Sequence, residues 1–280
     1  MNQARDEQAA GTWPDYRVVA RNISRHAEPN IHRDETAKAY GFKRALIAGR
    51  ALYSHLLHPA AARWGEAWLG RQRSAVRFLQ PAYDGDRLTV HVAGAPADDP
   101  TALTVAGIAN AEGLLLARLE SDRPRPFPAP HALALAPAPR DDGTRAPGDW
   151  AHLALGQALP AQSWTPRAED NRAWCAAIGE TLPLFLEGEA PPLHPGLLPS
   201  ATTELLHRFL LIGAWVHVAS VFVAHRLVRA GEALELRATP LDKWERAGRQ
   251  FIQVYVGVLA QGRPCLEEYR TALINLPRKG

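Results

Sequence analysis

The chain carries the same succession of turn signals twice, and this internal repetition limits the folds available to it more than any other feature. Each copy has a glycine before a long helix, a glycine followed by an acidic residue, and a glycine in a hairpin-like turn. The pairs, separated by 146 to 149 positions, are Gly49 and Gly196, Gly85 and Gly231, and Gly113 and Gly262. Three signals at nearly one spacing predict two diverged copies of a unit of roughly 140 residues.

Both copies have the same order of predicted elements: a short polar helix or loop, a longer helix, and then several strands. The long helix is predicted at 50–69 in the first copy, with a kink at Pro59, and at 200–212 in the second, with Ser200 as its N-cap. The alternation of apolar residues predicts strands at 75–79, 87–93, 102–109 and 114–119, and at 215–226, 233–241, 250–260 and 264–273. A helix followed by consecutive strands predicts an α+β fold with an antiparallel sheet, and two such sheets can join into one.

A stretch rich in proline and alanine separates the two copies. It covers residues 124–147 and is predicted to be a linker. The predicted organisation is therefore an N-terminal repeat at 1–123 and a C-terminal repeat at 148–280, joined by this linker.

Composition excludes several classes of function. Hydrophobic residues make up 46% of the chain and charged residues 22%, which is typical of a globular protein. The net charge is only +3, and no basic run with interleaved aromatic residues is present, so nucleic-acid binding is not expected. The apolar stretch 205–224 contains Arg208, which favours a buried helix and strand over a membrane span.

The cysteines and the N-terminus indicate where the chain works. Cys175 and Cys265 form no CxxC pair and have no metal-ligand spacing, so we expect buried thiols, no metal site and no disulfide framework. The first residues lack the apolar core of a signal peptide. These observations predict a soluble protein of the cytoplasm, with no membrane partner.

A cluster of polar residues precedes the first long helix and contains the candidate chemistry. It reads Glu28-Pro29-Asn30-Ile31-His32-Arg33-Asp34, and Leu46-Ile47-Ala48-Gly49 then leads into the helix. This segment resembles the hydratase motif of the MaoC-like, hotdog-fold family of (R)-specific enoyl-thioester hydratases and dehydratases, approximately D-x-N-P-x-H-x-D followed by I-A-H-G. The family string F-x-x-P-x-x-x-G-D-x-L is matched by Phe78, Pro81, Gly85, Asp86 and Leu88.

The resemblance covers essentially the whole chain and implies a double hotdog, in which two repeats each wrap an antiparallel sheet around a central helix. It also implies reversible hydration of a 2-enoyl thioester, with a CoA thioester as substrate and no other cofactor. Adding water across the double bond needs a base for the water proton and an acid for the α-carbon. The thioester oxygen gains enolate character, which a backbone N–H at a helix N-terminus can stabilise.

The resemblance assigns these roles to particular residues. His32 and Glu28 would hold the water, and Gly49 would supply the amide donor as the first residue of the helix. Asn30 would orient the site, and Asp34 would cap the small helix. Arg50 and Tyr53, at the start of the long helix, are candidates to line the pocket and bind substrate. Glu28 stands four residues before His32, whereas the family acid usually stands five before the histidine. Ala48 occupies the position of the histidine in I-A-H-G.

The second copy departs from the motif in the opposite way. Glu180 occupies the position of the acid, but Leu182 replaces the asparagine and Phe185 replaces the histidine. Because phenylalanine cannot transfer a proton, we expect one active site per chain, in the first copy, with the second copy shaping the acyl tunnel. A homodimer of double-hotdog chains is also compatible with the family.

Several alternatives remain open from the sequence. Glu28 can equally be a solvated loop carboxylate, Gly49 a turn glycine required for close backbone approach, and Arg50 a ligand for a phosphate. His194 can reach a substrate or be buried, and His217 fits a core histidine. The whole chain can be a non-catalytic acyl-thioester-binding protein, or a hotdog thioesterase in which a carboxylate activates water against the thioester carbonyl.

Overall fold

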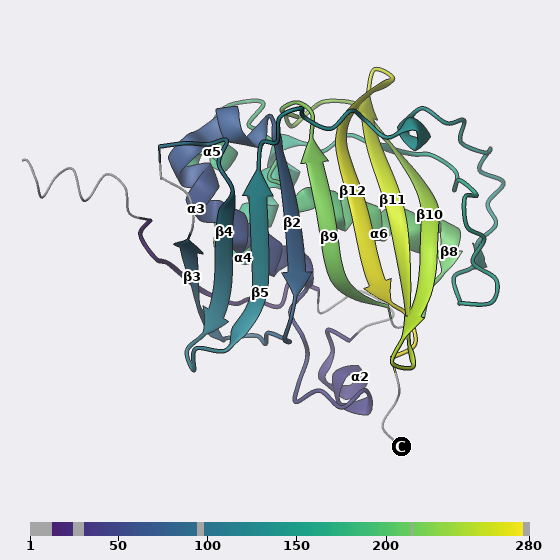
Figure 1. Ribbon diagram of the computed structural model, residues 1–280, viewed down its shortest axis with the longest axis horizontal. Helices are drawn as coiled ribbons and strands as arrows, with labels where there is room; N and C mark the ends of the chain where they lie inside the picture. Colours follow the sequence, from purple (N-terminus) through teal and green to yellow (C-terminus); the bar gives the residue numbers. More distant parts are fainter. Residues whose placement is uncertain (1–12, 25–30, 94–97, 214, 277–280) are drawn as a thin grey trace, which may run out of the picture.

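A single antiparallel sheet of ten strands organises the molecule (Figure 1). The computed structural model describes residues 13–24, 31–93, 98–213 and 215–276. One half of the sheet has the strand order β1 (Tyr16–Val19), β3 (Arg87–Ala93), β4 (Thr104–Asn110), β5 (Leu115–Asp122) and β2 (Gln72–Phe78). The other continues with β9 (Val216–Ala224), β12 (Arg263–Leu273), β11 (Arg249–Ala260), β10 (Leu234–Arg246) and β7 (Gln162–Trp164). The two halves mirror each other, and they join where β2 pairs with β9.

The two long helices, α3 (Gly49–Leu69) and α6 (Leu197–Phe209), lie on one face of this sheet (Figure 1). α3 begins at the predicted Gly49 and α6 directly after the predicted Gly196, and both pack their buried residues against the sheet. Shorter elements are α2 (Asp34–Ala39), α4 (Ala168–Ile178), α5 (Pro183–Leu186), the 3₁₀ helix η1 (Ala132–Ala134), and a small parallel pair of β6 (Ala146–Pro147) with β8 (Leu210–Leu211). The predicted α+β double hotdog is therefore confirmed.

The two halves repeat small structural devices as well as strand order. A carboxylate closes the same turn in both, since Asp86 accepts the Tyr83 N–H at 2.9 Å and Glu232 accepts the Arg229 N–H at 2.7 Å. An isolated bridge joins the loop before each long helix to that turn, Leu46 to Tyr83 and Pro192 to Arg229. Both carboxylates thus stabilise a turn. The domain boundaries at 123/124 and 147/148 stay predictions.

Both long helices differ in detail from the predictions. Pro59 lies within α3 without interrupting it, and the non-helical residue is Gly65, at φ 58° and ψ −143°. A proline keeps a φ that a helix tolerates, whereas only glycine adopts this positive φ at little cost. Helix α6 begins at Leu197, three residues before the predicted cap, and Ser200 lies inside its first turn.

The predicted linker is packed against the second half of the sheet. The His131 N–H donates to Glu267 of β12 at 2.8 Å, and Arg237 of β10 donates to the carbonyl groups of Ala134 and Ala136. Glu267 also accepts from Tyr255 at 2.7 Å. The linker therefore covers polar groups of the sheet that would otherwise face water.

Candidate functional site

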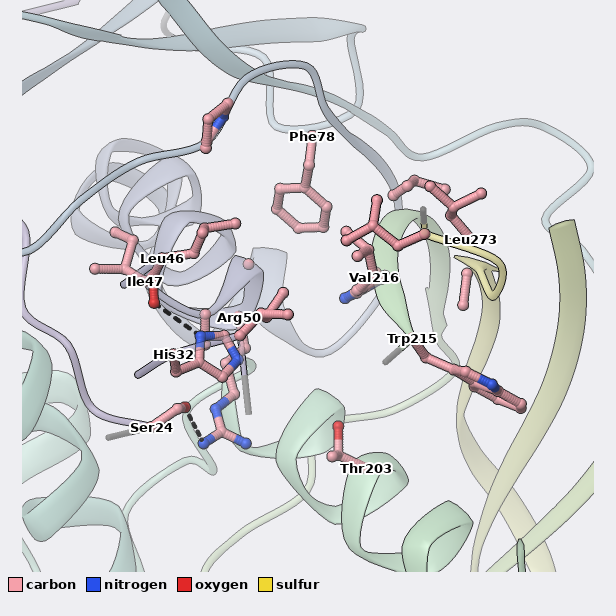
Figure 2. Close-up of a pocket in the computed structure, with 18 of the residues that line it drawn as sticks. Ser24, His32, Leu46, Ile47, Arg50, Phe78, Thr203, Trp215, Val216 and Leu273 are labelled. Carbon is pink, nitrogen blue, oxygen red and sulfur yellow. Dashed lines mark hydrogen bonds between the residues drawn. The ribbon is translucent and has the colours of Figure 1, made fainter. Parts of the chain in front are cut away.

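A cavity of about 380 Å³ opens between the two repeats (Figure 2). The first repeat contributes the loop that contains His32, the N-terminus of α3 and Phe78 at the end of β2. The second contributes residues of α6, β9 and β12, including Thr203, His217 and Arg270. A volume of this size suits a small ligand or a short acyl group.

His32 lies in the wall of this cavity with a defined tautomer. Its Nδ1 is 2.8 Å from the carbonyl oxygen of Leu46, which can only accept, so Nδ1 carries the proton. Nε2 is then the nitrogen that can take up a proton. Burial lowers the pKa of His32, the bond to Leu46 raises it, and the charge of Arg50 lowers it further, with a net decrease. His32 is therefore a neutral imidazole suited to act as a base.

Gly49 is the first residue of α3 and also lines the cavity. The first N–H groups of a helix have no partner within the helix, so they are available to a ligand at this end. The ring of Phe78 lies directly over Gly49, and a Cβ atom there would come 2.9 Å from Phe78 Cζ. Both interpretations of Gly49 from the sequence therefore fit its position: it can donate its amide to a ligand, and it allows the close approach of Phe78.

Arg50 lines the cavity beside His32, whereas Tyr53 does not. The Arg50 Nη2 donates to Ser24 Oγ at 2.9 Å (Figure 2). Its guanidinium also lies over the ring of Trp174, 5.6 Å from the centroid. Tyr53 lies about one turn further along α3, where the helix faces β2 and β9. Its ring stacks on Phe222 at 4.4 Å, and the side chain is buried. Tyr53 is thus absent from the lining of this cavity, and its predicted contact with a substrate stays a prediction.

Two residues of the predicted motif, Glu28 and Asn30, lie outside the described residues, so their roles stay predictions. Asp34 is described, and it does not cap α2. Its Oδ1 accepts the Ala45 N–H at 2.7 Å, and the N-cap residue Arg33 makes no side-chain cap hydrogen bond. Asp34 instead ties α2 to the segment that leads to Leu46.

The second repeat contributes a histidine to the same cavity, which the sequence placed only as a core residue. His217 Nε2 lies 2.7 Å from Ser220 Oγ and 3.2 Å from the Ala219 carbonyl oxygen. Ser220 in turn donates to Glu268 at 2.8 Å. Since the Ser220 hydroxyl proton is used for Glu268, Nε2 of His217 carries a proton and Nδ1 is left as the acceptor. Burial and the charge of Arg270 hold the pKa of His217 well below its usual value.

Glu268 anchors this chain of hydrogen bonds. It is fully buried and accepts from Thr202 at 2.6 Å and from Arg270 Nε at 2.9 Å, in addition to Ser220. A buried carboxylate with three donors has a fixed position. The orientation of His217 is therefore set by a rigid network of α6, β9 and β12.

A β-bulge explains why His217 was missed. In a regular strand, residues three apart face opposite sides of the sheet. The pairing of β9 with β12 skips one residue, since Ala272 pairs with His217 and Thr271 with Ala219. The extra residue, Val218, turns His217 and Ser220 to the same side. The only signal in the sequence was the presence of two polar residues in an otherwise apolar stretch.

Glu180, the acid of the second copy, is hydrogen-bonded to His58 of the first copy. Glu180 accepts from Nδ1 of His58 on α3 at 2.9 and 3.0 Å, and His194 Nε2 lies 4.0 Å from the same carboxylate. The Glu180 side chain is only 1% exposed. Burial raises the pKa of Glu180, but the hydrogen bond and charge of His58 outweigh it and hold the pKa below its usual value. Glu180 therefore links the repeats.

The other predicted groups near this pair are buried. His194 Nδ1 accepts from Trp174 Nε1 at 3.1 Å and from the Gly196 N–H at 3.0 Å, and burial lowers its pKa to about 3. His194 does not line the cavity described above. Phe185 packs against the His194 ring with a centroid distance of 4.5 Å.

The cysteines are free and buried, as predicted. Burial raises the pKa of Cys175 to about 12 and that of Cys265 to about 11, so neither is an activated thiolate. Within the described ranges, no cluster of three or more histidine, cysteine or carboxylate residues could hold a metal ion. No helix of the described chain is long and apolar enough to cross a membrane.

Comparison with known protein families found no matching family model, and no curated protein matches the sequence. Solved structures match over nearly the whole chain. One, provisionally described as a MaoC domain protein dehydratase from Chloroflexus aurantiacus, has a TM-score of 0.62 and 14% identity, and covers 95% of each chain. A double hotdog protein of Mycobacterium tuberculosis has a TM-score of 0.53 and 16% identity, covering 96% of this chain and 97% of its own.

Thioesterases share the same architecture. A structure provisionally described as an oleoyl thioesterase from Lactobacillus plantarum has a TM-score of 0.53 and 10% identity, covering 93% of this chain and 96% of its own. At these identities the likeness concerns the fold. The chain therefore has the double hotdog fold shared by MaoC-like dehydratases and hotdog thioesterases.

Proposed function

We propose that the protein is a hydro-lyase that adds water to, or removes it from, a 2-enoyl or 3-hydroxyacyl thioester, with CoA as the expected carrier. The observation that supports this most strongly is the placement of His32. Its tautomer is set by Leu46, and it shares a cavity with the N-terminus of α3 at Gly49. A base and an amide donor in one small cavity are the two groups that conjugate addition of water requires.

In the hydration direction, Nε2 of His32 takes a proton from water while the water oxygen bonds to the β-carbon. The electrons of the double bond move toward the thioester, and the Gly49 N–H stabilises the charge on the carbonyl oxygen. The protonated His32 then delivers this proton to the α-carbon, which restores the neutral imidazole and completes the addition. Glu28 is the proposed partner of His32 in these transfers, on the basis of the motif alone.

His217 is the proposed third participant. With its Nε2–H directed to Ser220 and the Ala219 carbonyl, it offers Nδ1 as an acceptor. A neutral imidazole at the cavity wall can accept a hydrogen bond from the water or from the β-hydroxyl group of the product. The second repeat thus contributes to recognition as well as to the shape of the cavity.

The test is to mix the purified protein with pent-2-enoyl-CoA and follow the absorbance of the conjugated thioester while assaying free thiol in parallel. Loss of conjugation without release of thiol is the expected result. Release of thiol from saturated pentanoyl-CoA would overturn the proposal in favour of a thioesterase. Binding of both ligands without turnover would overturn it in favour of a non-catalytic acyl-thioester-binding protein.

Because a structure described as a thioesterase shares this fold, release of thiol from the saturated thioester is a real alternative. Release of thiol separates the two activities, and the parallel assay measures it. A homodimer of double-hotdog chains is a further proposal, which the mass of the particle in solution would test.

A further inference from the structure

Arg50 lies in the cavity wall and has no counter-ion among the described residues. Its Nη2 donates to Ser24, while Nε is enclosed and has no acceptor among the described residues. It forms no ion pair with any described carboxylate, and the acid that acts on it electrostatically, Glu204, does so from beyond ion-pair distance. A half-buried guanidinium with its Nε enclosed carries a charge that no described anion compensates, which is costly unless a ligand supplies the anion.

The guanidinium is held in a defined orientation. Its Cζ lies over the ring of Trp174, 5.6 Å from the centroid, and Ser24 accepts from one end of the group. The N–H groups of a guanidinium lie along the edge of its plane. Because this edge matches the two oxygens of a carboxylate, an arginine held in this way is well arranged for an anionic group.

The charges around the cavity point in the same direction. Its described lining contains three arginines, Arg50, Arg249 and Arg270, and no acidic residue. Arg270 is already satisfied by Glu268, Thr203 and the Pro199 carbonyl, and Arg249 is exposed at the surface. Burial and repulsion by Arg270 lower the pKa of Arg50, as expected of a cation that lacks an anion. Among the three arginines of the described lining, Arg50 is therefore the one that is partly buried and can still bind an anion.

We infer that the acyl group of the substrate is short and carries a carboxylate, which Arg50 binds. The inference rests on the proposed function for one point, the thioester carbonyl at the Gly49 N–H. Since Arg50 follows Gly49 directly, an acyl group that reaches both must be only a few carbons long. The cavity of about 380 Å³ fits such a group.

The test uses two saturated thioesters that cannot be hydrated, so it does not depend on activity. Pentanoyl-CoA ends in a methyl group where 4-carboxybutanoyl-CoA ends in a carboxylate. Because the rest of the two ligands is identical, CoA contributes equally to both affinities. Titration calorimetry should show that the wild-type protein binds the carboxylate ligand about 10- to 100-fold more tightly. Arg50→Gln should abolish this preference and leave the affinity for pentanoyl-CoA nearly unchanged.

The matched control is Arg208→Gln, which removes an exposed arginine of α6 that does not line the cavity. It should keep the wild-type preference. Equal wild-type affinity for both ligands overturns the inference, and so does an equal loss for both ligands in Arg50→Gln, which would assign Arg50 to CoA or the thioester oxygen. If Arg50→Gln does not fold, the wild-type preference alone decides. If the wild-type protein prefers the carboxylate ligand but does not hydrate an enoyl thioester, only the proposed function is overturned.

Discussion

At the scale of single residues, the two imidazoles of the cavity hold opposite tautomers. Leu46 places the proton of His32 on Nδ1, whereas Ser220 and Ala219 place that of His217 on Nε2. Each histidine therefore presents a different nitrogen as acceptor. Two neutral imidazoles with anchored N–H groups can divide the tasks of proton transfer and hydrogen bonding to water.

Ser220 acts through His217 and is a positioning residue. Ser220→Ala removes the link between the imidazole and Glu268, so the ring can rotate. We expect kcat for hydration to fall by about 10-fold, the usual effect of removing a supporting hydrogen bond, with KM nearly unchanged. The pH dependence of kcat should also shift, because the tautomer of His217 is no longer held. A change in thermal stability alone, with kcat and its pH profile intact, would contradict this role.

Gly49 is constrained by Phe78 as much as by chemistry. Gly49→Ala puts a methyl group 2.9 Å from Phe78 Cζ, so the ring must move. We expect a loss of about 1–2 kcal/mol in the free energy of unfolding, measured by urea denaturation. In a protein that already carries Phe78→Leu, Gly49→Ala should lower the free energy of unfolding by less than it does in the wild type. Strictly additive losses would show that the two positions do not interact.

At the scale of elements, the strands were predictable and their special features were not. Alternation located β3, β4, β11 and β12 to within a few residues, because one face of each is buried. β1 and β7 have four and three residues, too few for a periodic signal. The bulge at Val218, which decides where His217 faces, depends on pairing with a strand about fifty residues away and leaves no local pattern.

The site was predictable to a similar degree. The motif identified His32, Gly49 and Arg50 as neighbours because they lie close in the chain. It did not identify His58, which lies on α3 and binds the acid of the other repeat. Contacts between repeats depend on how two helices pack on a common sheet, and a single sequence carries no record of that packing.

The pair of His58 and Glu180 fastens α3 to the loop of the second repeat. Glu180→Gln replaces a buried carboxylate that accepts from His58, and we expect a loss of about 2–4 kcal/mol in the free energy of unfolding at pH 7. The pKa of Glu180 is lower in the folded state, so its contribution is present above the unfolded value and is lost as pH falls through the folded one. The difference from wild type should therefore shrink below about pH 4.

An exposed pair provides the control for this measurement. Asp15 and His91 lie 2.6 Å apart at the surface, where water screens the interaction. Asp15→Asn should change stability little at any pH. A loss in Glu180→Gln no larger than in Asp15→Asn would contradict the buried link between the repeats.

At the scale of the whole molecule, buried neutral histidines should make the fold sensitive to acid. Burial lowers the pKa of His55 to about 4 and that of His194 to about 3. Between these values and about 6.5 the unfolded chain binds protons that the folded one does not, so stability falls as pH decreases through this window. Urea denaturation at pH 7.5, 5.5 and 4.5 should show a continuous decrease.

His55 gives this prediction a specific variant. Both of its ring nitrogens are buried and have no hydrogen-bond partner among the described residues. His55→Leu should therefore raise the free energy of unfolding by about 1–2 kcal/mol at pH 7 and flatten its pH dependence. Unchanged pH dependence in this variant would show that His55 does not titrate as a buried neutral group.

The two repeats use their polar side chains differently. His32 and His58 both belong to the first repeat, but His32 faces the open cavity while His58 is hydrogen-bonded to Glu180. In the second repeat Phe185 and His194 fill the space near that acid. Duplication has thus produced one candidate site to which both halves contribute, and one buried polar contact that holds them together.

The most direct test of the central claim is the rate of hydration of pent-2-enoyl-CoA by His32→Gln beside wild type and His91→Gln, an exposed histidine of β3. With His32 as the proton-transfer group, kcat should fall at least about 100-fold in His32→Gln and stay near wild type in His91→Gln. Hydration at the wild-type rate by a folded His32→Gln protein would contradict the claim.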